Sequence, residues 1–407
     1  KGTLLRTGPN PVAPGPNHHW FVGDGMLHAI QLGNGEAKSY RNRWVRTKAL
    51  EEKTGLAAAV GSQVELMIQG SGNVNVVGHA GRVLALPEVG LPYEMDTRLN
   101  TKGLYDYAGK LASNMTAHPK IDGRTGEMLF FGYEVFAPFL RYHEASANGD
   151  LIKSIDIDLP EGIMMHDFGV TQSRIIFMDL PVAADLSLME KGFGMPFQWN
   201  DAHQSRLGIM DRSSETDTVK WIDIDPCFVF HPLNSYDDGD KIVMDVVRYQ
   251  KMMTAEGDND YEQGSNLVRW VIDPAAGTVE TTVLRDIDME FPRVNPKFEC
   301  YQHQYGYALM TGGEQGFSDL LKFDLEAGTT QTYKVGDNCA GGEPVFVGSS
   351  NSEAEDDGYI LSVVYNGDTE LSELHIIDAQ TFSAQPLAIV KLGARVPFGF
   401  HGNFVID

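Results

Sequence analysis

The stretch VPFGFHGNF, residues 396–404, carries His401 between glycines and phenylalanines near the end of the chain. Three other histidines stand in equally unusual contexts: His118 in TAHP, His166 in MMHDF and His231 in FVFHPLN. Imidazole nitrogen is a good ligand for iron, zinc, copper and nickel. The four positions are too widely separated for a local motif such as HExxH, so a shared site requires a fold that joins distant segments. The axis of a β-propeller does this, because an inner strand of each blade points there.

Short apolar runs rich in β-branched residues recur along the chain, separated by Gly, Asn and Asp. They occupy residues 74–77, 82–86, 128–133, 173–178, 241–247, 307–310 and 359–364. Many short strands at such spacing predict an all-β barrel, sandwich or propeller. Repeats of about 50 residues would give about seven blades, although no crisp repeat motif is visible. We expect one domain over residues 1–407, a turn at residues 122–126, and helical exceptions at residues 47–60 and 105–113.

The composition excludes several classes of partner. Acidic residues outnumber basic ones 56 to 32, and the formal charge of −24 disfavours nucleic acids and anionic membrane surfaces as partners. The chain has no run of 18 apolar residues and no secretory pattern. Its three cysteines, Cys227, Cys300 and Cys339, show no metal-binding spacing. We therefore expect a reduced cytoplasmic protein with buried thiols, and we expect the native start to lie before Lys1.

Eight segments taken in order resemble the carotenoid cleavage oxygenase family, which includes apocarotenoid and stilbenoid oxygenases and a retinoid isomerase branch. The segments are LRTGPNP (5–11), WFVGDGM (20–26), TAHP (116–119), HDFGVT (166–171), FHPLNSY (230–236), EFPRVN (290–295), EPVFV (343–347) and FHG (400–402). They run almost from end to end of the chain, so the resemblance is specific.

The resemblance implies an all-β, seven-bladed β-propeller with iron on the central axis and a helical and loop cap over the substrate tunnel. It implies one Fe(II) per chain, bound by His118, His166, His231 and His401. In the family, three such histidines donate a ring N–H to a carboxylate, and the matching positions are Glu88, Glu290 and Glu343. Buried carboxylates would balance the charge of the metal and fix each ring. The residues implied along the substrate tunnel are Phe21, Val74, Pro87 and Phe400.

The implied reaction is addition of O2 across a conjugated C=C bond of a carotenoid or apocarotenoid, which yields two carbonyl products. It requires no general base, so we assign no catalytic residue beyond the iron centre. The partners would be O2 and an apolar polyene or aryl-alkene, with at most transient membrane contact, because residues 48–70 lack a long apolar insertion.

Two positions bear on the choice of substrate. Many family members carry threonine at the position of Val74, whereas the retinoid isomerase branch carries valine, so isomerisation stays a minor alternative. Stilbenoid-cleaving members carry a lysine at the position of Pro87, and proline offers no donor to a substrate phenol. Cleavage of a stilbenoid or phenylpropanoid is therefore the second hypothesis. A propeller that binds an apolar ligand or a protein without turnover is the third.

Overall fold

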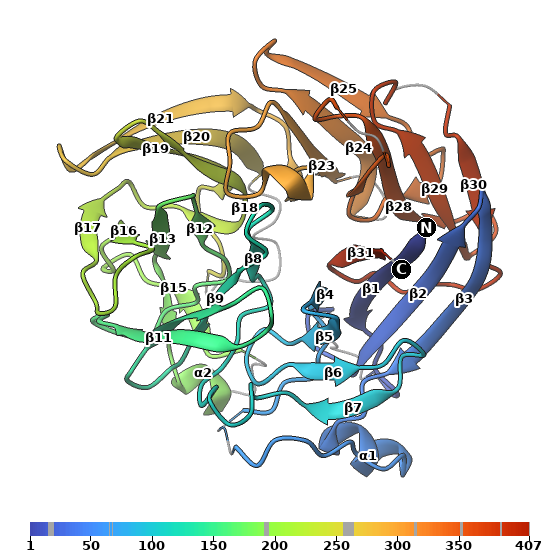
Figure 1. The fold of residues 1–407 in the computed structure, drawn as a ribbon, viewed down its shortest axis with the longest axis horizontal. Helices are drawn as coiled ribbons and strands as arrows, with labels where there is room; N and C mark the ends of the chain where they lie inside the picture. The colour runs from blue at the N-terminus through green and yellow to red at the C-terminus, as the bar shows by residue number, and fades with distance from the viewer. Residues whose placement is uncertain are drawn as a thin grey trace.

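The computed structural model describes residues 1–14, 20–64, 66, 68–190, 195–254, 264–312, 316–350, 353–382 and 385–406. Its strands form seven antiparallel sheets arranged as blades around one axis, which Figure 1 shows nearly end-on. The predicted all-β, seven-bladed propeller is thereby confirmed. Each blade is numbered here in the order in which its inner strand is met, starting from the blade that holds the first strand.

The first three blades use the amino-terminal part of the chain together with its last strand. Blade 1 consists of β31 (Gly402–Ile406), β1 (Gly2–Pro9), β2 (Gly25–Gly33) and β3 (Glu36–Trp44). Blade 2 consists of β4 (Asn75–His79), β5 (Arg82–Leu86), β6 (Tyr93–Met95) and β7 (Thr101–Leu104). Blade 3 consists of β8 (Lys120–Ile121), β9 (Met128–Tyr133), β10 (Leu140–Ala145) and β11 (Leu151–Ile157).

The remaining blades follow in chain order. Blade 4 consists of β12 (Gly169–Val170), β13 (Arg174–Asp179), β16 (Arg206–Asp211) and β17 (Lys220–Asp223). Blade 5 consists of β18 (Phe228–Asp238), β19 (Lys241–Tyr249), β20 (Ser265–Asp273) and β21 (Thr278–Arg285). Blade 6 consists of β22 (Met289–Arg293), β23 (Tyr305–Thr311), β24 (Phe317–Asp324) and β25 (Thr329–Tyr333). Blade 7 consists of β26 (Cys339–Ala340), β27 (Val345–Gly348), β28 (Gly358–Asn366), β29 (Leu371–Asp378) and β30 (Ala388–Lys391).

The ring is closed by pairing between the two ends of the chain. Strand β31 is antiparallel to β1, in a register that runs from Gly2 opposite Ile406 to Arg6 opposite Gly402. Figure 1 accordingly places both termini side by side in blade 1. This pairing gives β1 a hydrogen-bonded partner on its inner side. Without β31, the inner edge of β1 would have unpaired backbone groups.

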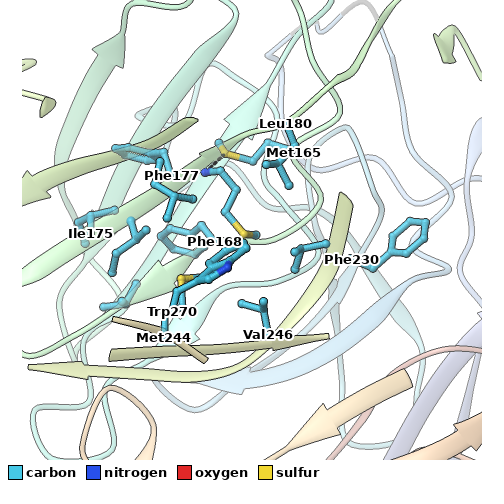
Figure 2. Packing of buried hydrophobic residues seen from close by; sticks show 14 of the residues in the cluster. Met165, Phe168, Ile175, Phe177, Leu180, Phe230, Met244, Val246 and Trp270 are labelled. Carbon is cyan, nitrogen blue, oxygen red and sulfur yellow. Dashed lines mark hydrogen bonds between the residues drawn. The ribbon is translucent and has the colours of Figure 1, made fainter. Parts of the chain in front are cut away.

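Apolar side chains fill the space between neighbouring blades. Figure 2 shows such packing, with Met165, Phe168 and Phe177 from the region of blade 4 facing Met244 and Trp270 of blade 5. Phe168 and Phe177 are fully buried. Burying one such side chain contributes about 2–3 kcal/mol. Together these interblade contacts hold the inner strands, and whatever side chains they carry, in fixed positions around the axis.

The predicted strands are all present, but the two helical expectations need correction. Residues 47–60 are helical only over α1 (Lys48–Thr54), because Gly55 adopts a left-handed conformation with φ of 75° and ends the helix. Residues 105–113 form turns instead of a helix. Tyr107 and Ala108 have φ of 53° and 58°, values that a right-handed helix does not allow. The predicted turn at residues 122–126 is confirmed between β8 and β9.

The other short elements lie in connections between strands. They are the ribbon of β14 (Val182–Ala184) and β15 (Phe197–Trp199), the helix α2 (Ser187–Glu190) and the 3₁₀ turn η2 (Pro296–Phe298). Within the described residues, no helix has both the length and the apolar character needed to cross a bilayer. Cys227 and Cys300 are buried as expected, whereas Cys339 is partly accessible, and all three thiols are free.

Candidate metal centre

Each predicted ligand lies just before, or within the first few residues of, the inner strand of its blade. His118 precedes β8, His166 precedes β12, His401 directly precedes β31, and His231 lies inside β18. The pairing of β18 with β19 shifts register on both sides of Pro232, the residue after His231. Proline has no N–H to donate to the strand ladder, so the regular pairing of β18 with β19 is interrupted next to His231.

The structure brings these four histidines together. One ring nitrogen of each lies within 4.8 Å of those of the others. The Nε2 atoms of His166 and His231 are only 3.2 Å apart. His118, His231 and His401 are buried, and His166 is nearly so. Four segments spread over most of the chain therefore converge on one point that water scarcely reaches.

Three glutamates bind the outer nitrogens of three of these rings, as the family resemblance implied. The Nδ1 atom of His166 lies 2.9 Å from Glu88, that of His231 2.5 Å from Glu290, and that of His401 2.8 Å from Glu343. A carboxylate can only accept, so each Nδ1 is the protonated nitrogen of its ring. The Nε2 lone pairs must then point inward.

Inward lone pairs are the arrangement that a bound cation needs. Two lone pairs 3.2 Å apart repel each other, and the buried Nε2 of His118 has no hydrogen-bond partner among the described residues. The charges agree with this interpretation. Three glutamates contribute −3 and Arg293, which is 3.1 Å from Glu343, contributes +1, so these four side chains together carry −2. A divalent cation of a metal that prefers imidazole would satisfy both the lone pairs and the charge.

Further hydrogen bonds hold the carboxylates in place. Tyr133 donates to Glu88 at 2.7 Å, and Tyr249 donates to Glu290 at 3.0 Å. Glu343 accepts the backbone N–H of Gly402 at 2.7 Å in addition to the His401 ring. These donors add to the histidine contacts of each carboxylate, although Oε2 of Glu88 has no hydrogen-bond partner among the described residues, so the three rings meet a preformed frame.

Burial and neighbouring charges shift the pKa values of the residues in the cluster in different directions. Burial, with the other histidines adding to it, holds the pKa of His118 well below its usual value. Burial also lowers the pKa of His401 to about 4, against the effect of Glu343. Burial opposes protonation of His166 too, but Glu88 and nearby carboxylates outweigh it and raise that pKa. Burial would raise the pKa of Glu343, yet Arg293 and His401 lower it to about 2. At neutral pH Glu343 is therefore ionised and can balance the charge of a bound cation.

Aromatic rings cover the cluster. Phe230 lies 5.3 Å from His166 and Phe291 lies 5.2 Å from His401, measured between ring centroids. Phe21 extends this wall, at 6.3 Å from Phe230 and 5.6 Å from Phe400. Phe21 and Phe400 thus lie beside the cluster as expected, although the substrate tunnel itself stays a prediction.

The other two residues expected along the tunnel are also close to the frame. The carbonyl of Val74 accepts the backbone N–H of His401 at 3.2 Å, which places this buried residue beside a predicted ligand. Pro87 is buried next to Glu88 and packs against Gly70, where an added Cβ would lie 2.1 Å from the Pro87 Cβ.

Sequence reasoning missed several members of the site. Arg293, Tyr133 and Tyr249 bind the carboxylates but show no pattern of their own in the sequence. Phe230 and Phe291 were detectable, because each is the immediate neighbour of a predicted site residue. Phe291 also adopts φ of 54°, a strained conformation for a buried aromatic residue and one that clusters at functional sites.

Comparisons with known proteins agree with this geometry. The family model described as retinal pigment epithelial membrane protein matches residues 1–406. A carotenoid cleavage oxygenase of Mycobacterium tuberculosis is 33% identical over 99% of this chain and 91% of its own length. The solved lignostilbene dioxygenase of Pseudomonas brassicacearum superimposes with a TM-score of 0.90 at 28% identity, covering 100% of this chain and 92% of that one. The cobalt-substituted apocarotenoid oxygenase of Synechocystis gives a TM-score of 0.87 at 29% identity, with the same coverage.

Proposed function

Because this chain belongs to the retinal pigment epithelial membrane protein family, whose curated relatives include carotenoid cleavage oxygenases and dioxygenases, we propose that it is a non-haem Fe(II) dioxygenase. The proposed reaction converts R–CH=CH–R′ and O2 into the two aldehydes R–CHO and R′–CHO, and both oxygen atoms enter the products. The substrate class is a carotenoid or apocarotenoid. One observation carries the proposal: four buried Nε2 atoms converge while three Nδ1–H groups are fixed on carboxylates.

The donor set is compatible with ferrous iron, which the family relationship favours among the metals that bind imidazole. Neutral imidazoles suit a divalent metal of intermediate softness, and four of them leave up to two octahedral positions for other ligands. When bound, Fe(II) would supply the one-electron chemistry that lets ground-state O2 react with an alkene. The proposed ligands are His118, His166, His231 and His401.

The chain itself contributes orientation and the exclusion of water. Glu88, Glu290 and Glu343 keep the rings of His166, His231 and His401 in one tautomer and one orientation, so these three need not rotate during turnover. Phe230 and Phe291 lie against the histidines and present apolar surface on which a conjugated chain can rest. The same surface keeps water from reactive species. No side chain has to abstract or deliver a proton, because the balanced reaction moves none.

Pro87 supports a polyene over a phenolic stilbene. It is the residue adjacent to Glu88, at the position where the stilbenoid branch implies a lysine. Its buried ring has no polar atom with which to hold a phenol. Cleavage of a stilbenoid is nevertheless the second candidate, since the lignostilbene dioxygenase is a close structural neighbour at TM-score 0.90.

Product analysis tests this function. The purified protein, loaded anaerobically with Fe(II), is mixed with ¹⁸O2 and either an apocarotenal or a 4-hydroxystilbene. We expect aldehydes from the apocarotenal, each carrying ¹⁸O before exchange with water, and little turnover of the stilbene. Isomerised but uncleaved substrate would instead favour the retinoid isomerase alternative. His231→Ala should abolish cleavage, whereas His79→Ala, at a histidine bonded to the Gly126 carbonyl outside the cluster, should retain it.

A further inference from the structure

His118 differs from the other three histidines in what its outer nitrogen meets. The carboxylate nearest to its Nδ1 is that of Asp167, whose Oδ2 is 3.8 Å away, too far for a hydrogen bond. The other three rings have carboxylates at 2.5–2.9 Å. The backbone N–H of His118 bonds to Thr116, but that contact does not fix the orientation of the ring.

Asp167 is held away from His118 by a competing cation. The ammonium of Lys120 lies 2.8 Å from Oδ1 and 2.9 Å from Oδ2, so it engages both carboxylate oxygens. The backbone N–H of Phe168 also donates to Oδ1 at 2.7 Å. The Asp167 side chain is only 2% exposed, and that of Lys120 is 15% exposed. Such a buried pair is tight, and its two members act on the metal site with opposite charges.

We propose that Lys120 and Asp167 together set how firmly His118 binds the metal. The Asp167 carboxylate orients the His118 ring, and Lys120 limits how closely that carboxylate approaches Nδ1. The inference rests on the proposed function, since it presumes a metal at the four histidines. Asp167 is a positioning residue here, not a catalytic one. His118 is then the most weakly oriented of the four ligands, because a charge-assisted hydrogen bond fixes each of the others.

The two members of the pair should affect metal retention in opposite directions. Asp167→Asn removes the negative charge beside His118 and leaves Lys120 unpaired near the cation, so the metal should leave faster. Lys120→Met removes that positive charge and frees Asp167 to move toward Nδ1, so the metal should leave more slowly. A merely structural ion pair would behave differently, because breaking it from either side destabilises the fold and loosens the site in both variants.

Iron release measures this directly and does not depend on turnover. Each protein is loaded with Fe(II) under nitrogen, and its transfer to an excess of a chromogenic ferrous chelator is followed. We expect Asp167→Asn to release iron about tenfold faster, at the lower end of the loss typical for outer-shell partners. We expect Lys120→Met to release iron at about half the wild-type rate or less. Asp167→Glu, whose longer carboxylate can reach Nδ1, should retain iron at least as well as the wild type.

The buried ion pair of Lys322 and Asp356, 2.7 Å apart and outside the cluster, provides matched controls. Asp356→Asn and Lys322→Met should leave release unchanged. If Lys120→Met fails to fold, as circular dichroism would show, Lys120→Gln replaces it with the same expectation. Equal acceleration in Asp167→Asn and Lys120→Met, or no effect in either, overturns the inference while the proposed function stands. A wild-type protein that binds no iron overturns the proposed function, and the inference with it.

Discussion

Glu343→Gln is a sharp test of the buried frame, because it changes one charge and almost no volume. Glu343 accepts hydrogen bonds from the His401 ring at 2.8 Å, the Gly402 backbone at 2.7 Å and Arg293 at 3.1 Å. A glutamine carbonyl can replace one or two of these acceptor contacts. It cannot neutralise Arg293 or contribute to the charge of −2 that the metal requires.

The size of the effect follows from the pKa of this carboxyl. The pKa falls from 4.5 to about 2, a difference of about 2.5 units, with Arg293 and His401 overcoming the cost of burial. At about 1.4 kcal/mol per unit, ionised Glu343 contributes about 3 kcal/mol to the stability of the metal-free protein. The pKa is depressed, so this contribution is present above pH 4.5 and is lost as the pH falls toward 2.

Urea unfolding at pH 7 with excess chelator would measure this contribution. We expect Glu343→Gln to lose up to about 3 kcal/mol of unfolding free energy, and its Fe(II) affinity to fall about 10–100-fold. Glu373→Gln is the matched control, since Glu373 is a buried carboxylate of blade 7 whose contacts, His375 at 3.4 Å and Asn366 at 3.5 Å, both lie outside the cluster. A Glu343→Gln protein as stable as the wild type, with unchanged iron affinity, would refute the account of the frame.

Three further predictions concern acid stability, ring closure and substrate choice. Burial lowers the pKa of His28 and His143 to about 3, so protonation favours the unfolded chain. The contribution of each neutral histidine to the free energy of unfolding should be fully present above pH 6.5. In urea titrations at pH 5.5 it should be smaller by about 1 kcal/mol per histidine. A His143→Gln variant with the pH dependence of the wild type would contradict this. Deleting residues 401–407 removes one ligand and the β31 partner of β1, so thermal unfolding should occur at lower temperature and iron should be absent from metal analysis. A truncated protein that keeps one iron would contradict the closure. Pro87→Lys adds a donor beside the cluster, so the ratio of kcat/KM for a 4-hydroxystilbene to that for an apocarotenal should rise, whereas Pro87→Ala should not raise it; an equal ratio in both variants would count against the role of this position.

Most of the fold was predictable, because its strands are marked by local patterns. The runs at 82–86 and 128–133 coincide with β5 and β9, since β-branched and aromatic residues between turns leave little alternative. The stretch at 105–113 misled because its apolar spacing fits a helix, whereas Tyr107 and Ala108 take left-handed conformations. Such conformations depend on tertiary contacts that no short window of sequence contains.

The candidate site was predictable only in part, for a related reason. The four histidines stand in distinctive segments, and resemblance to a family supplied their shared role and the three glutamates. Arg293 and Lys120 could not be found in the same way, because a lysine or arginine on a strand is ordinary in sequence. Its significance comes from the carboxylate it meets, and that carboxylate belongs to another part of the chain.

Anomalous diffraction at the iron edge, from crystals of protein loaded with Fe(II), tests the central claim most directly. The account predicts one iron per chain, bonded to the Nε2 atoms of His118, His166, His231 and His401. An iron bound through fewer of these nitrogens, an iron at another position, or loaded crystals without an anomalous peak at the cluster would contradict it.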